Sequence, residues 1–160
     1  MSGEKPLRPG EIVAEGLAPP AGPVLRFVGR IRTPWGPGEC PKNIGKARET
    51  GRGARVELDP AFAPALLGLE IGQPVVLLYW LHEARRDLLR QSPRHIDGTR
   101  GTFALRSPNR PNSIGLATVR ITALDGAAGT LGIDAIDCFD GTPLLDIKPW
   151  LERVDLPPAP

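Results

Sequence analysis

The chain has 160 residues, 41% of them hydrophobic, and a formal net charge of +2 at pH 7, which suits one soluble domain with its own core. No apolar run approaches the ~20 residues that span a bilayer, and the N-terminus lacks the pattern of a signal peptide, so we expect a cytoplasmic protein. The 19 glycines and 19 prolines argue against long helices and favour short strands joined by turns.

The cysteines and histidines are too few and too dispersed to predict a metal site. Cys40 and Cys138 are far apart in the sequence, and neither they nor His82 and His95 form the closely spaced pairs typical of zinc ligands. We therefore expect no metal. A disulfide between the two cysteines is possible, but reduced thiols fit a cytoplasmic protein better.

The first third of the chain contains two predicted strands and a long loop. Residues 1–23 are rich in proline, glycine and glutamate and are expected to form a mobile N-terminal segment. Residues 24–31 predict a first strand that ends before Thr33-Pro34. Residues 35–53 lack periodicity and exceed a usual connector, which predicts a functional loop. Residues 55–58 predict a second strand.

A short helix and an apolar strand are expected next. Asp59 and Pro60 predict a helix start, with the end near Gly68. Residues 74–81 are eight consecutive apolar residues, typical of a strand that is buried on both faces or belongs to a barrel. His82 follows this strand and is a candidate general base or hydrogen-bonding partner.

The remaining strands are predicted from alternating patterns. Residues 114–124 place Ala117, Val119 and Ile121 on one face, which indicates a half-buried strand. Residues 130–135 repeat the alternation after a turn and predict a hairpin partner, and residues 101–105 predict a further strand. Many short strands and almost no helix favour a β-barrel or a sandwich.

Two charged segments stand apart from the core pattern. RSPNRPNSIG (residues 106–115) and DGTPLLDIKPW (residues 140–150) place charges beside prolines and glycines, which predicts rigid loops of the kind that form sites. In the first, the candidates for binding an anion are Arg106, Arg110 and Asn112. In and just before the second, the carboxylates of Asp137, Asp140 and Asp146 could hold a ribose. Lys148 is a nearby cation. Structural pairing between the two groups, or turn capping by Asp140, is the alternative.

Charge is unevenly distributed along the chain. Residues 26–55 carry eight Lys and Arg against two Asp and Glu, residues 85–110 carry seven against two, and residues 111–160 carry three against seven. The first two segments predict a basic surface for an anionic partner such as RNA. The alternative is that the charges intermix on folding.

No nucleotide-binding fingerprint is present. Gly36-x-Gly38 and Gly51-x-Gly53 do not complete the G-x-G-x-x-G pattern between a strand and a helix, so a Rossmann site is not expected. Tyr79 and Trp80 are expected in the core, with stacking on a purine as the alternative.

The chain resembles the TrmO family, also called TsaA-like or YaeB-like. The resemblance covers residues 27–152 and is carried by VGRIRTPW, GTFALRSPNRPNSIGL and IDAIDCFDGTPLLDIKPW. It implies a mainly all-β protein, an up-and-down antiparallel β-barrel with short helical and loop insertions spanning residues 24–155, followed by a tail at 156–160. It also implies an S-adenosyl-L-methionine-dependent methyltransferase for threonylcarbamoyladenosine in tRNA, working as a homodimer.

The resemblance further implies a set of cofactor contacts. They are Pro41, Lys42, Asn43, Leu81, His82, Arg106, Leu116, Ile136, Asp137, Cys138 and Phe139. Added to these from the residues themselves, Asp137 or Asp140 is expected to hold the ribose, and His82 to orient the methyl acceptor as the candidate catalytic group. Candidate substrate contacts are Arg110, Asn112 and Lys148.

The chain departs from the family pattern in three places. Pro-Arg-Gln is here Pro41-Lys42-Asn43, Phe-Ser-His is replaced around residues 71–75, and the chain ends soon after DIKPW. Cofactor binding is therefore better supported than the tRNA substrate. Two alternatives stay open: an S-adenosyl-L-methionine-binding module or sensor without catalysis, and an RNA-binding barrel without a cofactor.

Overall fold

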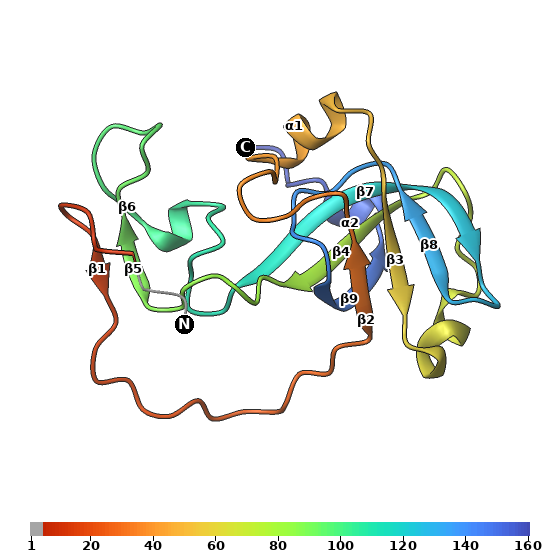
Figure 1. Ribbon diagram of the computed structural model, residues 1–160, viewed down its shortest axis with the longest axis horizontal. Helices are drawn as coiled ribbons and strands as arrows, with labels where there is room; N and C mark the ends of the chain where they lie inside the picture. The colour runs from red at the N-terminus through yellow and green to blue at the C-terminus, as the bar shows by residue number, and fades with distance from the viewer. Residues whose placement is uncertain (1–4) are drawn as a thin grey trace. The chain divides into compact units, whose positions relative to one another are not determined.

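The computed structural model describes residues 5–160, which form two compact units (Figure 1). The barrel unit comprises Leu25–Trp80 and Gly115–Pro160, and the small unit comprises residues 5–24 and Leu81–Ile114. Each unit has its own sheet. The expected division into residues 1–23, 24–155 and 156–160 stays a prediction.

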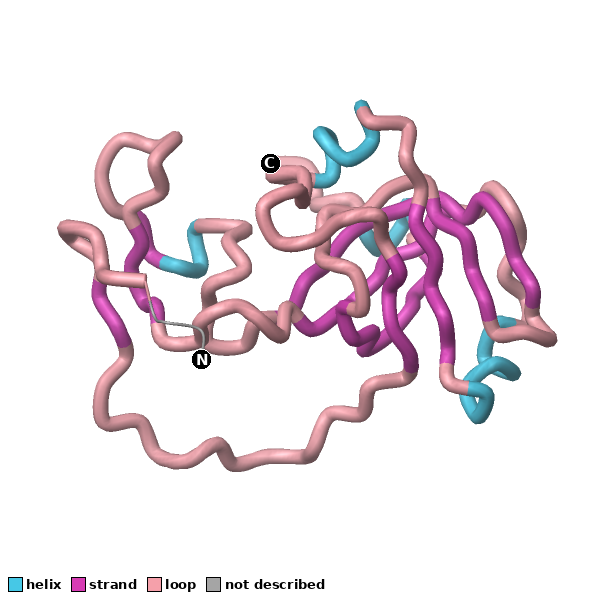
Figure 2. The backbone as a smooth tube through the Cα atoms, in the orientation of Figure 1, coloured by secondary structure: helices cyan, strands magenta, loops and turns pink. Residues whose placement is uncertain are grey.

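A closed antiparallel β-barrel forms the barrel unit, as expected (Figure 2). Around the barrel the strands are β2 (Gly29–Arg32), β3 (Ala54–Leu58), β8 (Thr130–Ile133), β7 (Ile114–Asp125), β4 (Pro74–Trp80) and β9 (Thr142–Pro149). The predicted hairpin of β7 and β8 is confirmed. Strands distant in sequence also pair, since β9 lies between β4 and β2.

Alternating side chains fill the barrel. On β4, Val75, Leu77 and Tyr79 are buried while their neighbours are half-buried, so β4 is a barrel strand rather than one buried on both faces. On β7, the predicted inward residues are buried. The Tyr79 ring packs over Gly115, where an added Cβ would lie 2.1 Å from the ring. Only glycine allows this approach.

The predicted first strand began too early. β2 starts at Gly29, and the apolar Val24, Leu25 and Phe27 before it are exposed, Val24 by 97%. β3 and β9 pair with β2 from Gly29 onward. β-Rich residues form a strand only where a neighbouring strand satisfies their backbone groups. That condition begins at Val28, whose amide donates to Leu144 O at 2.9 Å and whose carbonyl accepts from the Asp59 amide at 3.0 Å.

The prediction of a loop over residues 140–150 was also wrong, because most of this segment is a strand. Asp140 and Gly141, with φ of 79° at Gly141, form a turn, and β9 then runs from Thr142 to Pro149. Proline removes one donor but leaves its carbonyl available. Pro143 is accommodated opposite Arg30, and Pro149 ends the strand.

Two short helices differ from what the sequence predicted. Residues 35–53 contain α1 (Ile44–Glu49), which the expected loop omitted; the Asn43 side chain caps it. The helix expected after Asp59 is the 3-10 helix η1 (Pro60–Leu66), without a side-chain cap from Asp59. The last helix, α2 (Glu152–Asp155), is a single turn.

The small unit holds a three-stranded sheet in the order β1 (Ile12–Val13), β5 (Leu88–Gln91) and β6 (Arg100–Gly101). The strand predicted over residues 101–105 was wrong, because the 3-10 helix η2 (Thr102–Ala104) follows β6. The buried Thr102 Oγ1 donates to Leu88 O at 2.8 Å and accepts from Gln91 Nε2 at 2.9 Å. These side-chain bonds compete with a continued ladder.

Residues 5–160 contain neither a helix suited to crossing a membrane nor a cluster of metal ligands. No described helix combines the length and apolar character that a membrane crossing requires. No group of three or more His, Cys, Asp or Glu side chains in this range is placed to hold a metal ion.

Candidate functional site

The candidate residues are divided between the two units. The barrel unit carries Pro41, Lys42, Asn43, Leu116, Ile136, Asp137, Cys138, Phe139, Asp140 and Lys148. The small unit carries Leu81, His82, Arg106, Arg110 and Asn112. Each set is described within its own unit.

The segment from Ile136 to Asp140 is fixed against the chain that follows β2. Trp35 is buried and its Nε1 donates to Ile136 O at 2.9 Å, while Thr33 Oγ1 donates to Cys138 O at 3.0 Å. The Asp140 amide donates to Trp35 O at 2.9 Å. Backbone held this firmly gives side chains a defined direction at little entropic cost on binding.

Burial alternates along the same segment. Ile136 and Cys138 are buried, whereas Asp137 and Phe139 are half-buried. The side chains of Ile136 and Cys138 therefore belong to the core and cannot contact a ligand at the surface. Asp137, Phe139 and Asp140 are the members of the segment whose side chains reach solvent.

The two cysteines are free thiols. Burial, and secondarily the charge of Asp137, raises the pKa of Cys40 to about 11. Burial raises the pKa of Cys138 to about 12, with smaller effects from Thr142, Cys40 and the neighbouring aspartates. Both thiols are protonated at neutral pH, so neither is an activated nucleophile.

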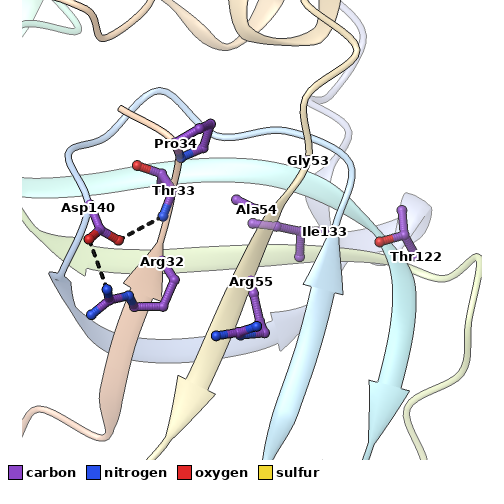
Figure 3. Close-up of a pocket in the computed structure, with 9 residues that line it drawn as sticks. All are labelled: Arg32, Thr33, Pro34, Gly53, Ala54, Arg55, Thr122, Ile133 and Asp140. Carbon is purple, nitrogen blue, oxygen red and sulfur yellow. Dashed lines mark hydrogen bonds and ion pairs between the residues drawn. The ribbon is translucent and has the colours of Figure 1, made fainter. Parts of the chain in front are cut away.

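Asp140 is engaged by its own chain. Its Oδ1 accepts from the Thr33 amide at 3.0 Å, and its Oδ2 lies 3.0 Å from Arg32 Nη2 (Figure 3). Asp140 therefore pairs with Arg32, a partner that the sequence reasoning did not consider, and the pairing expected with Arg106 or Arg110 stays a prediction. Both carboxylate oxygens orient the end of β2, where the arginine side chain is half-exposed.

The loop of residues 41–43 runs into α1, and the helix is tied to the barrel. Asn43 Oδ1 accepts from the Lys46 amide at 2.9 Å, which caps the helix. Arg48 Nε donates to Asp134 Oδ2 at 2.9 Å, and its Nη2 donates to Thr118 O at 2.6 Å. Pro41 is half-buried and Lys42 is exposed. The position of this loop thus depends on Arg48.

Asp134 is the barrel end of that connection. Burial acts to raise the pKa of Asp134, but hydrogen bonds from the Arg120 amide at 2.7 Å and from Arg48, together with the Arg48 charge, outweigh it and lower the pKa. Asp134 is therefore ionised at neutral pH. Asp134 lies two residues before Ile136. Its carboxylate therefore holds both α1 and the start of the segment from Ile136 to Asp140.

In the small unit, His82 and Leu81 follow the end of β4. The Leu81 amide donates to Ser113 O at 2.8 Å. The His82 side chain is 39% exposed, and its Nε2 lies 3.8 Å from Glu83 Oε1, beyond a normal hydrogen bond. An exposed imidazole on a bonded backbone can reach a ligand.

The RSPNRPNSIG segment is held together by its own polar groups. Arg110 Nη1 donates to Leu105 O at 2.9 Å, and the buried Ser113 donates through Oγ to Arg110 O at 3.0 Å. Asn112 is exposed and its carbonyl accepts from the Ile114 amide at 2.7 Å. Arg110 thus bonds backbone carbonyls within the small unit. Arg106 is exposed.

Two further candidates lie on barrel strands. Lys148 Nζ pairs with Asp146 Oδ2 at 2.9 Å on β9, and both side chains are largely exposed. Leu116 on β7 is 46% exposed. Because an exposed ion pair contributes little free energy, Lys148 can readily exchange Asp146 for another partner.

A hollow of about 490 Å³ lies on the barrel unit (Figure 3). It is lined by Arg32, Thr33, Pro34, Gly53, Ala54, Arg55, Thr122, Ile133 and Asp140. Asp140 is the only one of these that the sequence singled out as a candidate. Arg32 and Arg55 were counted only as part of the basic segment. The alternation of Arg30 and Arg32 with apolar residues in VGRIRTPW was a signal that could have placed them on the outer face.

The comparisons with known proteins agree with this geometry. A family model described as the tRNA-methyltransferase O N-terminal domain matches residues 30–156. The chain belongs to the TrmO family. The resemblance carried by the sequence motifs is thereby confirmed.

The TrmO family includes named relatives and solved structures. A probable S-adenosyl-L-methionine-binding protein, VirR, of Rhizobium radiobacter is 41% identical over 78% of this chain and 69% of its own length. An S-adenosyl-L-methionine-binding protein of Archaeoglobus fulgidus is 32% identical over 82% of this chain and 92% of its own length. The crystal structure of TrmO from Pseudomonas aeruginosa matches with a TM-score of 0.64 and 31% identity, over 84% of this chain. The match spans 58% of that TrmO chain.

Proposed function

We propose that this chain binds S-adenosyl-L-methionine and transfers its methyl group to a modified adenosine, threonylcarbamoyladenosine, of tRNA. The observation that carries the proposal is the family match across residues 30–156, which includes the whole segment fixed by Trp35. The names of the relatives support the cofactor. The tRNA substrate rests on the family resemblance.

The exposed chemistry of the barrel unit fits this cofactor. Asp137 offers a half-buried carboxylate for ribose hydroxyls, and Phe139 offers a half-buried aromatic ring for an apolar or cationic group. Lys42 and the Asn43 amide offer donors for a carboxylate. When bound, S-adenosyl-L-methionine supplies an electrophilic methyl group on a sulfonium.

Residues of this chain would position the acceptor rather than bond to it covalently. Methyl transfer is an in-line displacement, so the protein contributes by orientation and exclusion of water. We assign His82 to orient the acceptor and to take up its proton, and Arg106 to neutralise an acidic group of the cofactor or substrate. Candidate substrate contacts are Arg110, Asn112 and Lys148.

Binding of S-adenosyl-L-methionine by calorimetry tests the cofactor site. Asp137→Asn, which keeps the size of the side chain, should weaken binding about 10-fold or more because a charge-assisted hydrogen bond is lost. Asp97→Asn, at an exposed aspartate of the small unit, is the matched control and should bind as the wild type does. Equal affinity of the Asp137 variant and the wild type would remove Asp137 from the site.

Methyl transfer separates the three functions. The wild type is incubated with methyl-labelled S-adenosyl-L-methionine and unfractionated tRNA, and the label in the RNA is counted. We expect label in tRNA and a large loss in His82→Ala. Tight cofactor binding without transfer would instead favour the non-catalytic module, and RNA binding without cofactor affinity would favour the RNA-binding barrel.

The family resemblance also supports a homodimer, and the free cysteines suit a reducing compartment such as the cytoplasm. Sedimentation equilibrium of the purified chain tests the assembly. A mass near twice the 17.2 kDa of one chain is expected, and a single-chain mass at all concentrations would contradict it.

A further inference from the structure

The outer face of β2 and β3 carries a block of charged side chains. Arg30 and Arg32 project from β2, and Arg55 and Glu57 project from β3, each pair alternating with buried residues. In the register of the two strands, Arg30 lies opposite Glu57 and Arg32 lies opposite Arg55. Three arginines therefore share this face with one glutamate.

The opposition of Arg32 and Arg55 is unfavourable by itself, because like charges directly across two strands repel. Each arginine has one carboxylate partner: Arg32 Nη2 lies 3.0 Å from Asp140 Oδ2, and Arg55 Nε donates to Glu57 Oε1 at 3.1 Å. Exposed ion pairs of this kind contribute little free energy. Their clearer effect is to orient both guanidinium groups.

Donors remain on both guanidinium groups. An arginine has five N–H donors. Arg55 uses Nε and Nη2 for Glu57, and Arg32 uses Nη2 for Asp140. Among residues 5–160, neither Nη1 group has an acceptor. A planar fork with free donors matches a phosphate, which can accept bonds from both arginines at once.

The surface between these arginines is hollowed (Figure 3). Gly53 forms part of the lining, and an added Cβ there would lie 2.9 Å from Ile133 O, so a side chain at this position would require the backbone to shift. Thr122 reaches the hollow from an irregularity in β7 between Ile121 and Ala123; such bulges often redirect a side chain toward a site.

The hollow combines cations with an apolar wall. Pro34 and Ala54 line it beside Arg32 and Arg55, and the exposed Thr122 adds a hydroxyl. Its volume of about 490 Å³ lies within the range of small-ligand pockets. A phosphate with an attached sugar fits this combination, since the phosphate meets the arginines and the sugar meets the apolar wall.

We propose that this hollow is a phosphodiester-binding subsite for RNA on the barrel, formed by Arg32 and Arg55 and braced by Asp140 and Glu57. The inference rests on the proposed function in that tRNA is the RNA expected to occupy it. The subsite positions the RNA backbone and does not read sequence, because phosphate contacts carry no base information.

Binding of fluorescently labelled, unfractionated tRNA, measured by anisotropy over a range of salt concentrations, tests the subsite. Arg55→Gln should lower the affinity about three- to tenfold, and the slope of log affinity against log salt should fall by about 0.7 to 0.9, the loss of one phosphate contact. Arg55→Lys should keep the salt slope and lose part of the affinity, because the charge remains and the fork is lost.

Arg153→Gln is the matched control. Arg153 is an exposed arginine on α2 and does not line the hollow, so its replacement makes the same change in net charge. An equal loss of tRNA affinity in the Arg55 and Arg153 variants would overturn the subsite, since only net charge would then matter. Absence of tRNA binding by the wild type would overturn it as well. Thermal unfolding of each variant confirms that it is folded.

Calorimetry with S-adenosyl-L-methionine distinguishes this inference from the proposed function. If the wild type binds the cofactor and methylates tRNA, but Arg55→Gln binds tRNA as the wild type does, the subsite alone is wrong. If the wild type binds no cofactor, yet its tRNA affinity depends on Arg55 and not on Arg153, the subsite stands and the methyltransferase proposal fails.

Discussion

At the scale of single residues, two aspartate side chains hold separate segments of the chain together through hydrogen bonds and ion pairs. Asp134 accepts bonds from Arg48 and from the Arg120 amide, and Asp140 accepts from Thr33 and Arg32. Each carboxylate joins a strand end to another segment. Removing such a group leaves its donors without a partner, which costs more than the bond itself contributes.

Asp134 gives a pH-dependent prediction. The pKa of Asp134 is lowered in the folded protein from an ordinary value of 3.8, so its contribution to stability is complete above that value and is lost as pH falls through the lower, folded-state pKa. Asp134→Asn should reduce the free energy of unfolding by about 1.5 kcal/mol at pH 7. Urea unfolding of both proteins from pH 7 to pH 3 measures the difference.

That difference should become smaller below about pH 4, where the carboxylate begins to be protonated in the unfolded chain. Asp97→Asn, at an exposed aspartate, should match the wild type at every pH. A difference for Asp134→Asn that stays constant down to pH 3 would show that packing, rather than ionisation, explains its effect.

At the scale of the elements, glycine positions decide how strands approach. Gly115 on β7 lies beneath the Tyr79 ring on β4, and a methyl group there must displace the ring. Gly115→Ala should destabilise the protein by about 1–3 kcal/mol through overpacking, which lowers the melting temperature by several degrees. Differential scanning calorimetry measures this.

Gly126→Ala is the control for that prediction. Gly126 lies just after β7, its Cβ would meet nothing within 4 Å, and its φ is not positive, so the melting temperature should change little. Equal melting temperatures for Gly115→Ala and the wild type would show that the Tyr79 ring moves without cost.

At the scale of the whole molecule, stability should differ sharply along the chain. Barrel strands such as β4 pair on both sides, whereas residues 15–27 are exposed throughout and contain no helix or strand. Hydrogen exchange monitored by mass spectrometry should therefore show the slowest exchange over β4 and β7 and the fastest over residues 15–27. Slow exchange in residues 15–27 would contradict the expected mobile N-terminal segment.

The sequence alone determined the class of fold, the family and the positions of β3, β4, β7 and β8. Alternation placed Ala117, Val119 and Ile121 in the core, and the three motifs by themselves identified the TrmO family. These features depend on local spacing and on residue identity, which a sequence displays directly.

Only the tertiary structure decided which strands pair and which charges meet. The sequence predicted DGTPLLDIKPW as a loop, but most of it is β9, because β2 and β4 offer partners on both sides. Likewise Asp140 meets Arg32, and Arg32 faces Arg55. These groups are brought together by the register between strands that are distant in sequence. The pattern of residues within a single strand does not specify that register.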